Sequence, residues 1–184
     1  MNDDMKMILF SDLHYLDDNH KEKTNRKLTK LAIPVIEKLI YEINQKIKPD
    51  ICVNLGDLIE DTEDYKQDIM KYDLNNTKLP ILMFCHYGIA EDNMNENWWF
   101  SKDSERALLK NRKQIKEIIK KHSVLAIFSG HQHWTKKINE DNLDYYIIGS
   151  LTEDINNNGI PDAVYYVVSL NDDNIDVKEQ HIKL

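Results

Sequence analysis

The stretch from Val124 to His133 reads Val-Leu-Ala-Ile-Phe-Ser-Gly-His-Gln-His, an apolar run that ends in two histidines. The apolar part has the length and the flanking residues of a buried β-strand. Extended residues two positions apart point in the same direction, so His131 and His133 can hold one group from one side. Taken alone, the pattern fits two structurally satisfied histidines as well as it fits a metal site.

Three further apolar runs end in the same kind of residue. Met5–Phe10 is followed by Asp12 and His14, Ile51–Leu55 by Gly56 and Asp57, and Ile81–Cys85 by His86. In α/β folds, ligand sites form beyond the carboxyl ends of the strands. Each short motif is common by itself, but its recurrence at four strand ends favours a metal centre. Carboxylate and imidazole ligands without cysteine suit manganese, iron or zinc better than calcium.

The rest of the chain predicts one α/β domain over residues 1–184, because it contains no internal repeat and no linker. Apolar residues at three-to-four spacing predict helices over Thr24–Lys48, Thr62–Tyr72 and Asp103–Lys121. Pro34 is expected to begin or to kink the first of these helices. Tyr145–Ile148, Ala163–Val168 and Ile175–His181 are typical of strands joined by Asn/Asp/Gly turns.

The composition and net charge of the chain limit which kinds of molecule it is expected to bind. The chain is 41% hydrophobic and 30% charged, with a formal net charge of −8, so we expect a compact protein that does not bind nucleic acid polymers. The first residues lack a secretory pattern and no apolar run is long enough to span a bilayer, so a cytoplasmic protein without a membrane partner is expected. Cys52 and Cys85 lie in apolar runs and are predicted to be reduced, buried thiols.

In the order of these motifs, the sequence resembles the calcineurin-like metallophosphoesterase superfamily over nearly its whole length. The stretch Leu74–Phe100 resembles the branch that contains manganese-dependent ADP-ribose and CDP-alcohol pyrophosphatases. The resemblance implies two facing mixed β-sheets flanked by helices. It also implies two divalent metal ions, Mn²⁺ or else iron or zinc. The first ion would be held by Asp12, His14, Asp57 and His133, and the second by Asp57, His86 and His131.

The reaction implied by this resemblance is hydrolysis of a phosphoester or pyrophosphate bond by a hydroxide that bridges the two metals. Asp57 and His86 would be the catalytic residues, and the substrate would be small, phosphorylated and nucleotide-like. Trp98 and Trp99 could stack a nucleobase, although packing at the rim of the core is the favoured interpretation of both. Asp154–Gly159 imitates the start of a calcium loop, and we interpret it as an Asn/Gly-rich turn.

One family motif, Gly-Asn-His, is missing between Asp57 and His86, as if a segment with its own strand had been removed. Its asparagine would bind the second metal and its histidine would protonate the leaving group, so a weak second site and impaired activity are expected. An unpaired sheet edge would invite a partner chain, and a homodimer is one arrangement that would cover it. Two hypotheses stay open: a metallophosphoesterase, or a catalytically silent metal-binding module that acts through protein contacts.

Overall fold

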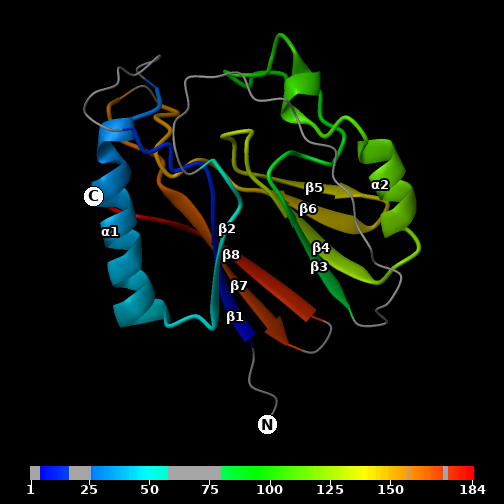
Figure 1. Ribbon diagram of the computed structural model, residues 1–184, viewed down its shortest axis with the longest axis horizontal. Coiled ribbons are helices and arrows are strands. Elements are labelled where there is room, and N and C mark those ends of the chain that lie inside the picture. Colours follow the sequence, from blue (N-terminus) through cyan, green and yellow to red (C-terminus); the bar gives the residue numbers. More distant parts are fainter. Residues whose placement is uncertain (1–4, 17–25, 58–79, 157, 172–173) are drawn as a thin grey trace.

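The computed structural model describes residues 5–16, 26–57, 80–156, 158–171 and 174–184. Two four-stranded sheets face each other; helix α1 covers the outer face of one and helix α2 lies beside the other (Figure 1). The helix expected over Thr62–Tyr72 falls outside the described residues.

The first sheet has the strand order β2-β1-β7-β8. Its strands are β1 (Met5–Phe10), β2 (Ile51–Asn54), β7 (Val164–Asn171) and β8 (Asn174–His181). β1 runs parallel to β2 and antiparallel to β7, and β7 and β8 form an antiparallel pair.

The second sheet has the order β3-β4-β6-β5. Its strands are β3 (Ile81–Cys85), β4 (Val124–Ser129), β5 (Lys136–Glu140) and β6 (Leu143–Ile147). β4 runs parallel to both β3 and β6, whereas β5 and β6 are antiparallel. Both sheets are therefore mixed, which confirms the predicted fold class of two facing mixed sheets flanked by helices.

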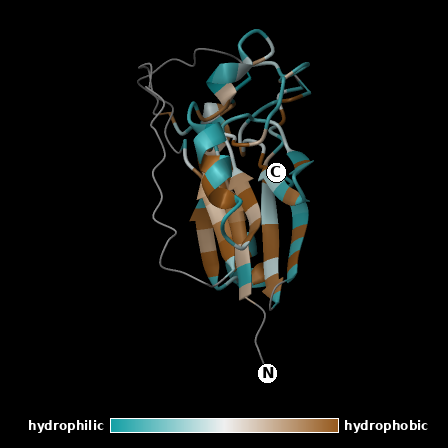
Figure 2. Cartoon of the chain, turned by 90° about the vertical axis from the view of Figure 1, so that its right-hand side faces the viewer, coloured by the Kyte–Doolittle hydropathy of each residue, from teal (hydrophilic) through white to brown (hydrophobic). Residues whose placement is uncertain are grey.

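The main core fills the space between the sheets. Leu9 of β1 packs there with Phe128 of β4 and with other fully buried side chains. Ile8 points to the opposite face of its sheet and packs against α1, because successive strand residues alternate between the two faces. The strands are accordingly striped with hydrophobic residues along their length (Figure 2).

Helix α1 (Ala32–Glu42) is shorter than predicted, since a 3-10 turn at Thr29–Leu31 precedes it and a π-helical turn at Ile43–Ile47 follows it. Pro34 lies in its first turn, where the missing backbone N–H has no intrahelical partner to lose. Val35 and Leu39 are buried against the first sheet. On another face of the helix, Ile33 and Ile40 are about half exposed, at 47% and 48%.

The single helix predicted over Asp103–Lys121 is wrong. The chain forms a 3-10 turn at Ser104–Ala107, then an extended stretch, and only then helix α2 (Arg112–Ile119). The interruption has a physical cause, because the N–H of Leu109 donates to the carbonyl of Gly88 and Leu108 forms a β-bridge with the same glycine. Tertiary pairing here overrides the helical spacing of the apolar residues.

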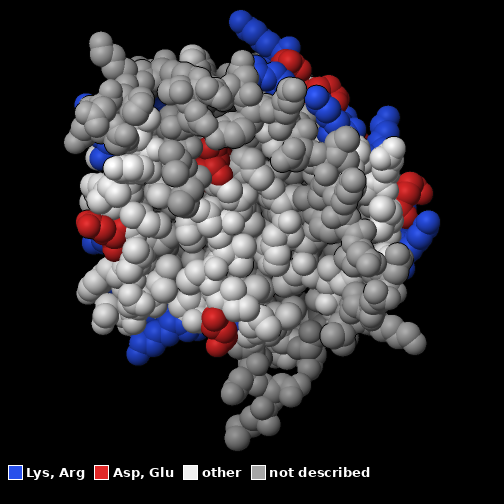
Figure 3. Space-filling view, in the orientation of Figure 1, with Lys and Arg blue, Asp and Glu red and all other residues white. Residues whose placement is uncertain are grey.

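The two cysteines differ. Cys85 is buried, as predicted, but Cys52 is exposed, which corrects the expectation of two buried thiols. Cys52 lies on β2, which is the terminal strand of its sheet among the residues described, so one flank has no described neighbour. No described helix is long and apolar enough to cross a membrane. Lys/Arg and Asp/Glu side chains of both signs are interspersed around the outline in Figure 3.

Candidate metal centre

The four predicted strand ends meet at one edge of the sandwich. After β1, the N–H of Asp12 donates to the carbonyl of Gly56 at 3.0 Å, which joins the loops after β1 and β2. The N–H of Gly130 donates to the carbonyl of His86 at 3.0 Å, which joins the loops after β3 and β4. A third bond connects the two sheets, from the N–H of His131 to Oδ2 of Asp12 at 3.0 Å.

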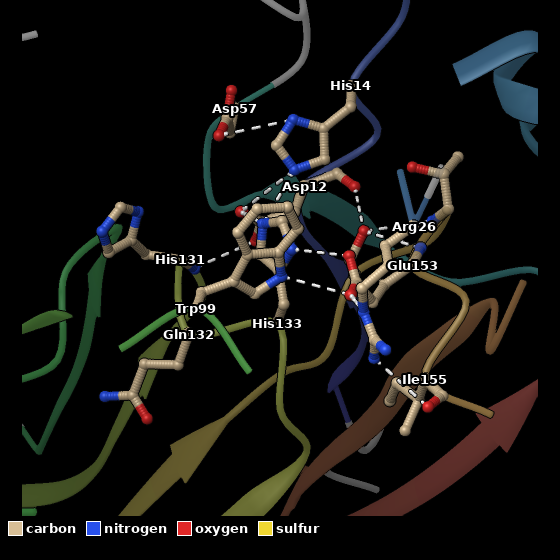
Figure 4. A network of polar contacts seen from close by, with 12 residues as sticks. Asp12, His14, Arg26, Asp57, Trp99, His131, Gln132, His133, Glu153 and Ile155 are labelled. Carbon is tan, nitrogen blue, oxygen red and sulfur yellow. Dashed lines mark hydrogen bonds and ion pairs between the residues drawn. The ribbon is translucent and has the colours of Figure 1, made fainter. Parts of the chain in front are cut away.

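Four of the predicted ligands form one compact group. Asp12, His14, Asp57 and His133 each offer one nitrogen or oxygen atom, and these atoms lie within 4.8 Å of one another (Figure 4). Nε2 of His14 and Nε2 of His133 are 2.8 Å apart, and Oδ1 of Asp12 is 3.2 Å from Nε2 of His133. Two atoms bound to a metal at about 2.1 Å are at most about 4.2 Å apart. The group therefore has nearly the dimensions of a coordination shell.

The backbone adopts an unusual conformation at the predicted ligand positions. Positive φ angles occur at Asp12 (55°), His14 (50°), Asp57 (52°), His131 (66°) and His133 (52°). This left-handed region is uncommon for residues other than glycine, but Asp and His adopt it more readily than most. Such conformations persist only where the surrounding structure imposes them, and they cluster at functional sites.

Two glycines allow the loops to approach closely. A Cβ on Gly130 would collide with Oγ of Ser11 and would lie 2.6 Å from Oδ2 of Asp12. Gly56 has a φ of +118°, and a Cβ there would lie 2.8 Å from Nδ1 of His86. A side chain at either position would push the loops apart, so glycine is required at both.

Asp12 and His133 are a buried, oppositely charged pair. Burial opposes ionisation of both, but hydrogen bonding to Asp12 and Glu153, and their charges, raise the pKa of His133 to about 9. Burial likewise would raise the pKa of Asp12, yet the bond and charge of His133, with His86 and His14, hold that pKa below its ordinary value. Asp12 and Glu153 are thus held in the ionised form, with the positive charge of His133 between them.

The residues present fit a divalent metal. Oδ1 of Asp12 is fully buried, lacks a hydrogen bond of good geometry, and faces Nε2 of both His14 (3.9 Å) and His133 (3.2 Å). Nδ1 of His14 faces Oδ2 of Asp57 at 3.5 Å. Two carboxylates and two imidazoles converge where a cation would satisfy all four, and this donor set suits manganese, iron or zinc.

His86 and His131, predicted for a second metal, lie beside this group but outside it. Their rings are 4.9 Å apart, and in Figure 4 the His131 ring lies to one side of the four ligands. Nδ1 of His86 is 3.0 Å from the carbonyl of Leu55, and Nε2 of His131 is 3.1 Å from the carbonyl of Arg106. Burial and the nearby His86 lower the pKa of His131 to about 3, so this ring is a neutral donor. Their role as ligands stays a prediction.

Glu153 is a buried neighbour of the site that the sequence did not reveal. Its Oε2 lies 3.1 Å from Nδ1 of His133, and its side chain is 1% exposed. The residue lies in the loop after β6 (Leu143–Ile147), six positions beyond the end of the strand, and belongs to no ligand motif. The only signal in the sequence is an acidic pair, Glu153-Asp154, within an otherwise ordinary turn.

The two tryptophans differ in their surroundings. Trp99 lies edge-on to the His133 ring at 5.7 Å and donates its indole N–H to Oε1 of Glu153 at 3.1 Å. Trp98 is 65% exposed, and the guanidinium of Arg26 lies 4.6 Å from its ring centre. Trp99 therefore packs at the rim of the site, whereas Trp98 presents an aromatic surface to solvent.

The Asp154–Gly159 segment has the contacts of a turn. Oδ1 of Asp154 accepts the N–H of Asn158 at 3.0 Å, and Oδ2 accepts the N–H of Gly159 at 2.7 Å. With both carboxylate oxygens bonded to the backbone of its own loop, Asp154 stabilises the turn, as the turn interpretation expects.

The fold defined by these sheets and strand ends is metallophosphoesterase-like. The solved structures similar to the chain include a conserved uncharacterized protein, a predicted phosphoesterase, from Streptococcus pneumoniae. That match has a TM-score of 0.50 and 12% identity, and covers 98% of this chain and 91% of the other. No protein-family model matches the chain, and no curated protein matches it significantly.

Two weaker structural matches accompany it. A dimetal phosphatase from Danio rerio gives a TM-score of 0.41 at 16% identity, with 55% of this chain and 29% of the other covered. Vps29 from Entamoeba histolytica, complexed with zinc, gives 0.36 at 13% identity, with 97% and 100% covered. The fold therefore rests on the Streptococcus pneumoniae match, which at 12% identity establishes the fold alone.

Proposed function

We propose that this chain is a metal-dependent hydrolase of phosphoester or pyrophosphate bonds. The observation that carries the proposal is the convergence of Asp12, His14, Asp57 and His133 at one edge of a metallophosphoesterase-like sandwich. A divalent ion bound there, with Mn²⁺ as the proposed physiological metal, would polarise a phosphoryl oxygen and lower the pKa of water.

The proposed metal site has a buried side and a side that is open to solvent. Asp12 and His14 are fully buried and form the closed side of the site, whereas the Asp57 side chain is 29% exposed. Substrate would therefore approach past Asp57, towards the side on which His86 and His131 lie. Those two histidines supply further nitrogen donors for a second ion or for the phosphoryl group.

The proposed substrate is small and phosphorylated, with a nucleotide-like group. The exposed aromatic surface of Trp98, backed by Arg26 at 4.6 Å, supports this choice, because a base could stack on the indole. Arg26 is linked to the metal group through Glu153, so the aromatic surface and the candidate centre belong to one connected rim.

A catalytically silent module is the second candidate. It is favoured by the exposed apolar side chains of α1, namely Ile33, Ile40 and Tyr41, which a protein partner could cover. The missing Gly-Asn-His motif favours it too.

One experiment separates the two candidates. Purified protein would be analysed for bound metal, and then assayed in added Mn²⁺ with a chromogenic phosphodiester and a chromogenic phosphomonoester. Metal-dependent turnover that is abolished in Asp12→Ala supports the hydrolase. Stoichiometric metal binding with no turnover of either ester would exclude a phosphoester hydrolase and favour the silent module.

A further inference from the structure

Glu153, in the loop after β6, contacts three other parts of the chain at the edge of the candidate metal centre. Its Oε2 lies 3.1 Å from Nδ1 of His133. Its Oε1 accepts hydrogen bonds from Nε of Arg26 at 3.0 Å and from the indole N–H of Trp99 at 3.1 Å. These partners come from the loop after β4, the segment before α1, and the segment between β3 and α2, as Figure 4 shows.

The backbone of Glu153 is held as firmly as its side chain. Its N–H donates to Oγ of Ser150 at 3.1 Å, and its carbonyl accepts the N–H of Asp162 at 2.8 Å. The same Ser150 hydroxyl donates to the carbonyl of Asp12 at 2.6 Å. The carboxylate is thus placed relative to the ligand loop by a short chain of hydrogen bonds.

The two carboxylate oxygens serve different partners. Oε1 contacts both Arg26, whose positive charge offsets the buried negative charge, and the indole N–H of Trp99. A purely structural ion pair would need no more than that. Oε2 faces the imidazole of His133, and this contact has a consequence for the ring.

The proton on Nδ1 of His133 decides what Nε2 can do. When Nδ1 donates its proton to Glu153, Nε2 presents a lone pair towards Asp12 and His14. A histidine that binds a metal through one nitrogen usually donates from the other to a carboxylate or carbonyl, which fixes both tautomer and orientation.

We propose that Glu153 is a positioning residue, which holds His133 with its proton on Nδ1 and its Nε2 aimed into the metal centre. The inference rests on the proposed function in one respect, that His133 binds the metal. Glu153 acts through His133 and does not itself touch the metal or the substrate.

Glu153→Gln tests this assignment sharply. Both partners of Oε1, Arg26 and Trp99, are donors, so the amide oxygen of glutamine must face them and its NH₂ must face His133. The ring can then only accept at Nδ1, which places the proton on Nε2 and opposes coordination of the metal by that nitrogen. Affinity for Mn²⁺, measured by isothermal titration calorimetry, should fall about tenfold or more, the typical effect of losing such a partner.

The matched control is Glu42→Gln. Glu42 is also a largely buried carboxylate, paired with Lys46 and with the hydroxyl of Tyr165, but on α1 and away from the site. It removes the same charge, so its Mn²⁺ affinity should stay at the wild-type value. In a His133→Ala background, adding Glu153→Gln should cause no further loss of affinity, because the residue acts only through that ring.

A further measurement does not depend on the folding of any variant. In wild-type protein loaded with Zn²⁺, nitrogen-15 NMR should show a proton on Nδ1 of His133. A proton on Nε2 would overturn the inference.

The outcomes separate the inference from the function beneath it. If wild type binds Mn²⁺ and Glu153→Gln binds it equally well, Glu153 does not position His133, and the proposed function stands. If Glu153→Gln only lowers the melting temperature of metal-free protein, its role is structural and the inference is wrong. If wild type binds no Mn²⁺, the proposed function fails and this inference fails with it.

Discussion

Nε2 of His14 and Nε2 of His133 lie 2.8 Å apart, although 119 positions separate the two residues in the chain. Two imidazole nitrogens face each other so closely only if a proton or a cation lies between them. The contact joins the loop after β1 in one sheet to the loop after β4 in the other. The stability of this edge of the sandwich therefore depends on the proton or cation that lies between the two nitrogens.

Replacement of Asp57 by alanine should remove bound metal and the stability that comes with it. A ligand that binds only the folded state stabilises it by about 2.7 kcal/mol at 100 times its Kd. For a chain of this size, a loss of that order lowers the melting temperature in Mn²⁺ by roughly 5–10 °C. Metal analysis and thermal unfolding with and without Mn²⁺ would measure both effects. Asp176→Asn, which replaces an exposed carboxylate on β8, is the control. An unchanged metal content in Asp57→Ala would remove the proposed site.

The two predicted metal positions should fill unequally. The first has four ligands already grouped within 4.8 Å, whereas His86 and His131 bond to backbone carbonyls beside it. Titration with Mn²⁺ should show one tight and one weaker event, and dialysis should release the weaker ion first. Two equally tight events would mean that a residue outside this set completes the second position.

Leaving-group chemistry should reveal the missing Gly-Asn-His motif. A nitrophenyl ester leaves as a stable anion, but an alkyl phosphodiester leaves as a basic alkoxide that needs a proton in the transition state. Loss of a positioned acid typically costs about 10²–10⁴-fold, and that cost should fall on the alkyl ester. Parallel assays of both esters, with Asp12→Ala as the inactive control, would measure the ratio. Similar rates on both would show that another group supplies the proton.

Gly130→Ala should loosen the candidate metal centre. The added methyl group would meet Oγ of Ser11 and Oδ2 of Asp12, so the loops after β1 and β4 must separate. We expect a loss of about 1–3 kcal/mol in the free energy of unfolding, with weaker Mn²⁺ binding. Gly159→Ala is the control, because an added Cβ there has no atom within 4 Å and the only strain comes from the φ of +76°. It should lose about 1 kcal/mol and keep its Mn²⁺ affinity.

The pairing of Asp144 with Lys137, neither of which belongs to the candidate metal group, should make stability depend on pH. Burial opposes ionisation of Asp144, but bonds from Lys137 and Asn139, each at 2.7 Å, lower its pKa in the folded state. A lowered folded pKa means that the stabilisation is present above the ordinary value of 3.8 and is lost as the pH falls through the folded value.

Urea unfolding of wild type and Asp144→Asn at pH 7 and pH 3 would test this. The difference between them should be about 0.2–1 kcal/mol at pH 7, as for other partly exposed pairs, and should shrink at pH 3. A difference independent of pH would assign the effect to packing.

The strands that carry the ligands were predictable because each is an apolar run that stops at a polar residue. β1 and β3 have the predicted bounds, and Asp12 and His133 meet as the strand-end argument expects. β5 (Lys136–Glu140) was not predicted, because its residues Lys-Lys-Ile-Asn-Glu are mostly polar and it forms only as the partner of β6.

Glu153 escaped prediction for a related reason. Its role depends on three partners that are distant in the chain, and no local pattern announces a residue of that kind. Cys52 is exposed on β2, which is the terminal strand of its sheet among the described residues, and its apolar neighbours in the sequence do not encode that position.

The left-handed backbone at the five predicted ligand positions affects how the candidate centre can be engineered. In a saturation library, asparagine would retain the conformation at Asp12 and Asp57 while removing a negative charge, so those variants would isolate the chemistry. Valine or isoleucine would remove the ligand and also oppose the positive φ, because β-branched residues rarely adopt it. Selections that start from β-branched replacements would therefore measure backbone strain and lost coordination together. They would underestimate how many changes of ligand the site tolerates when it is adapted to a different metal.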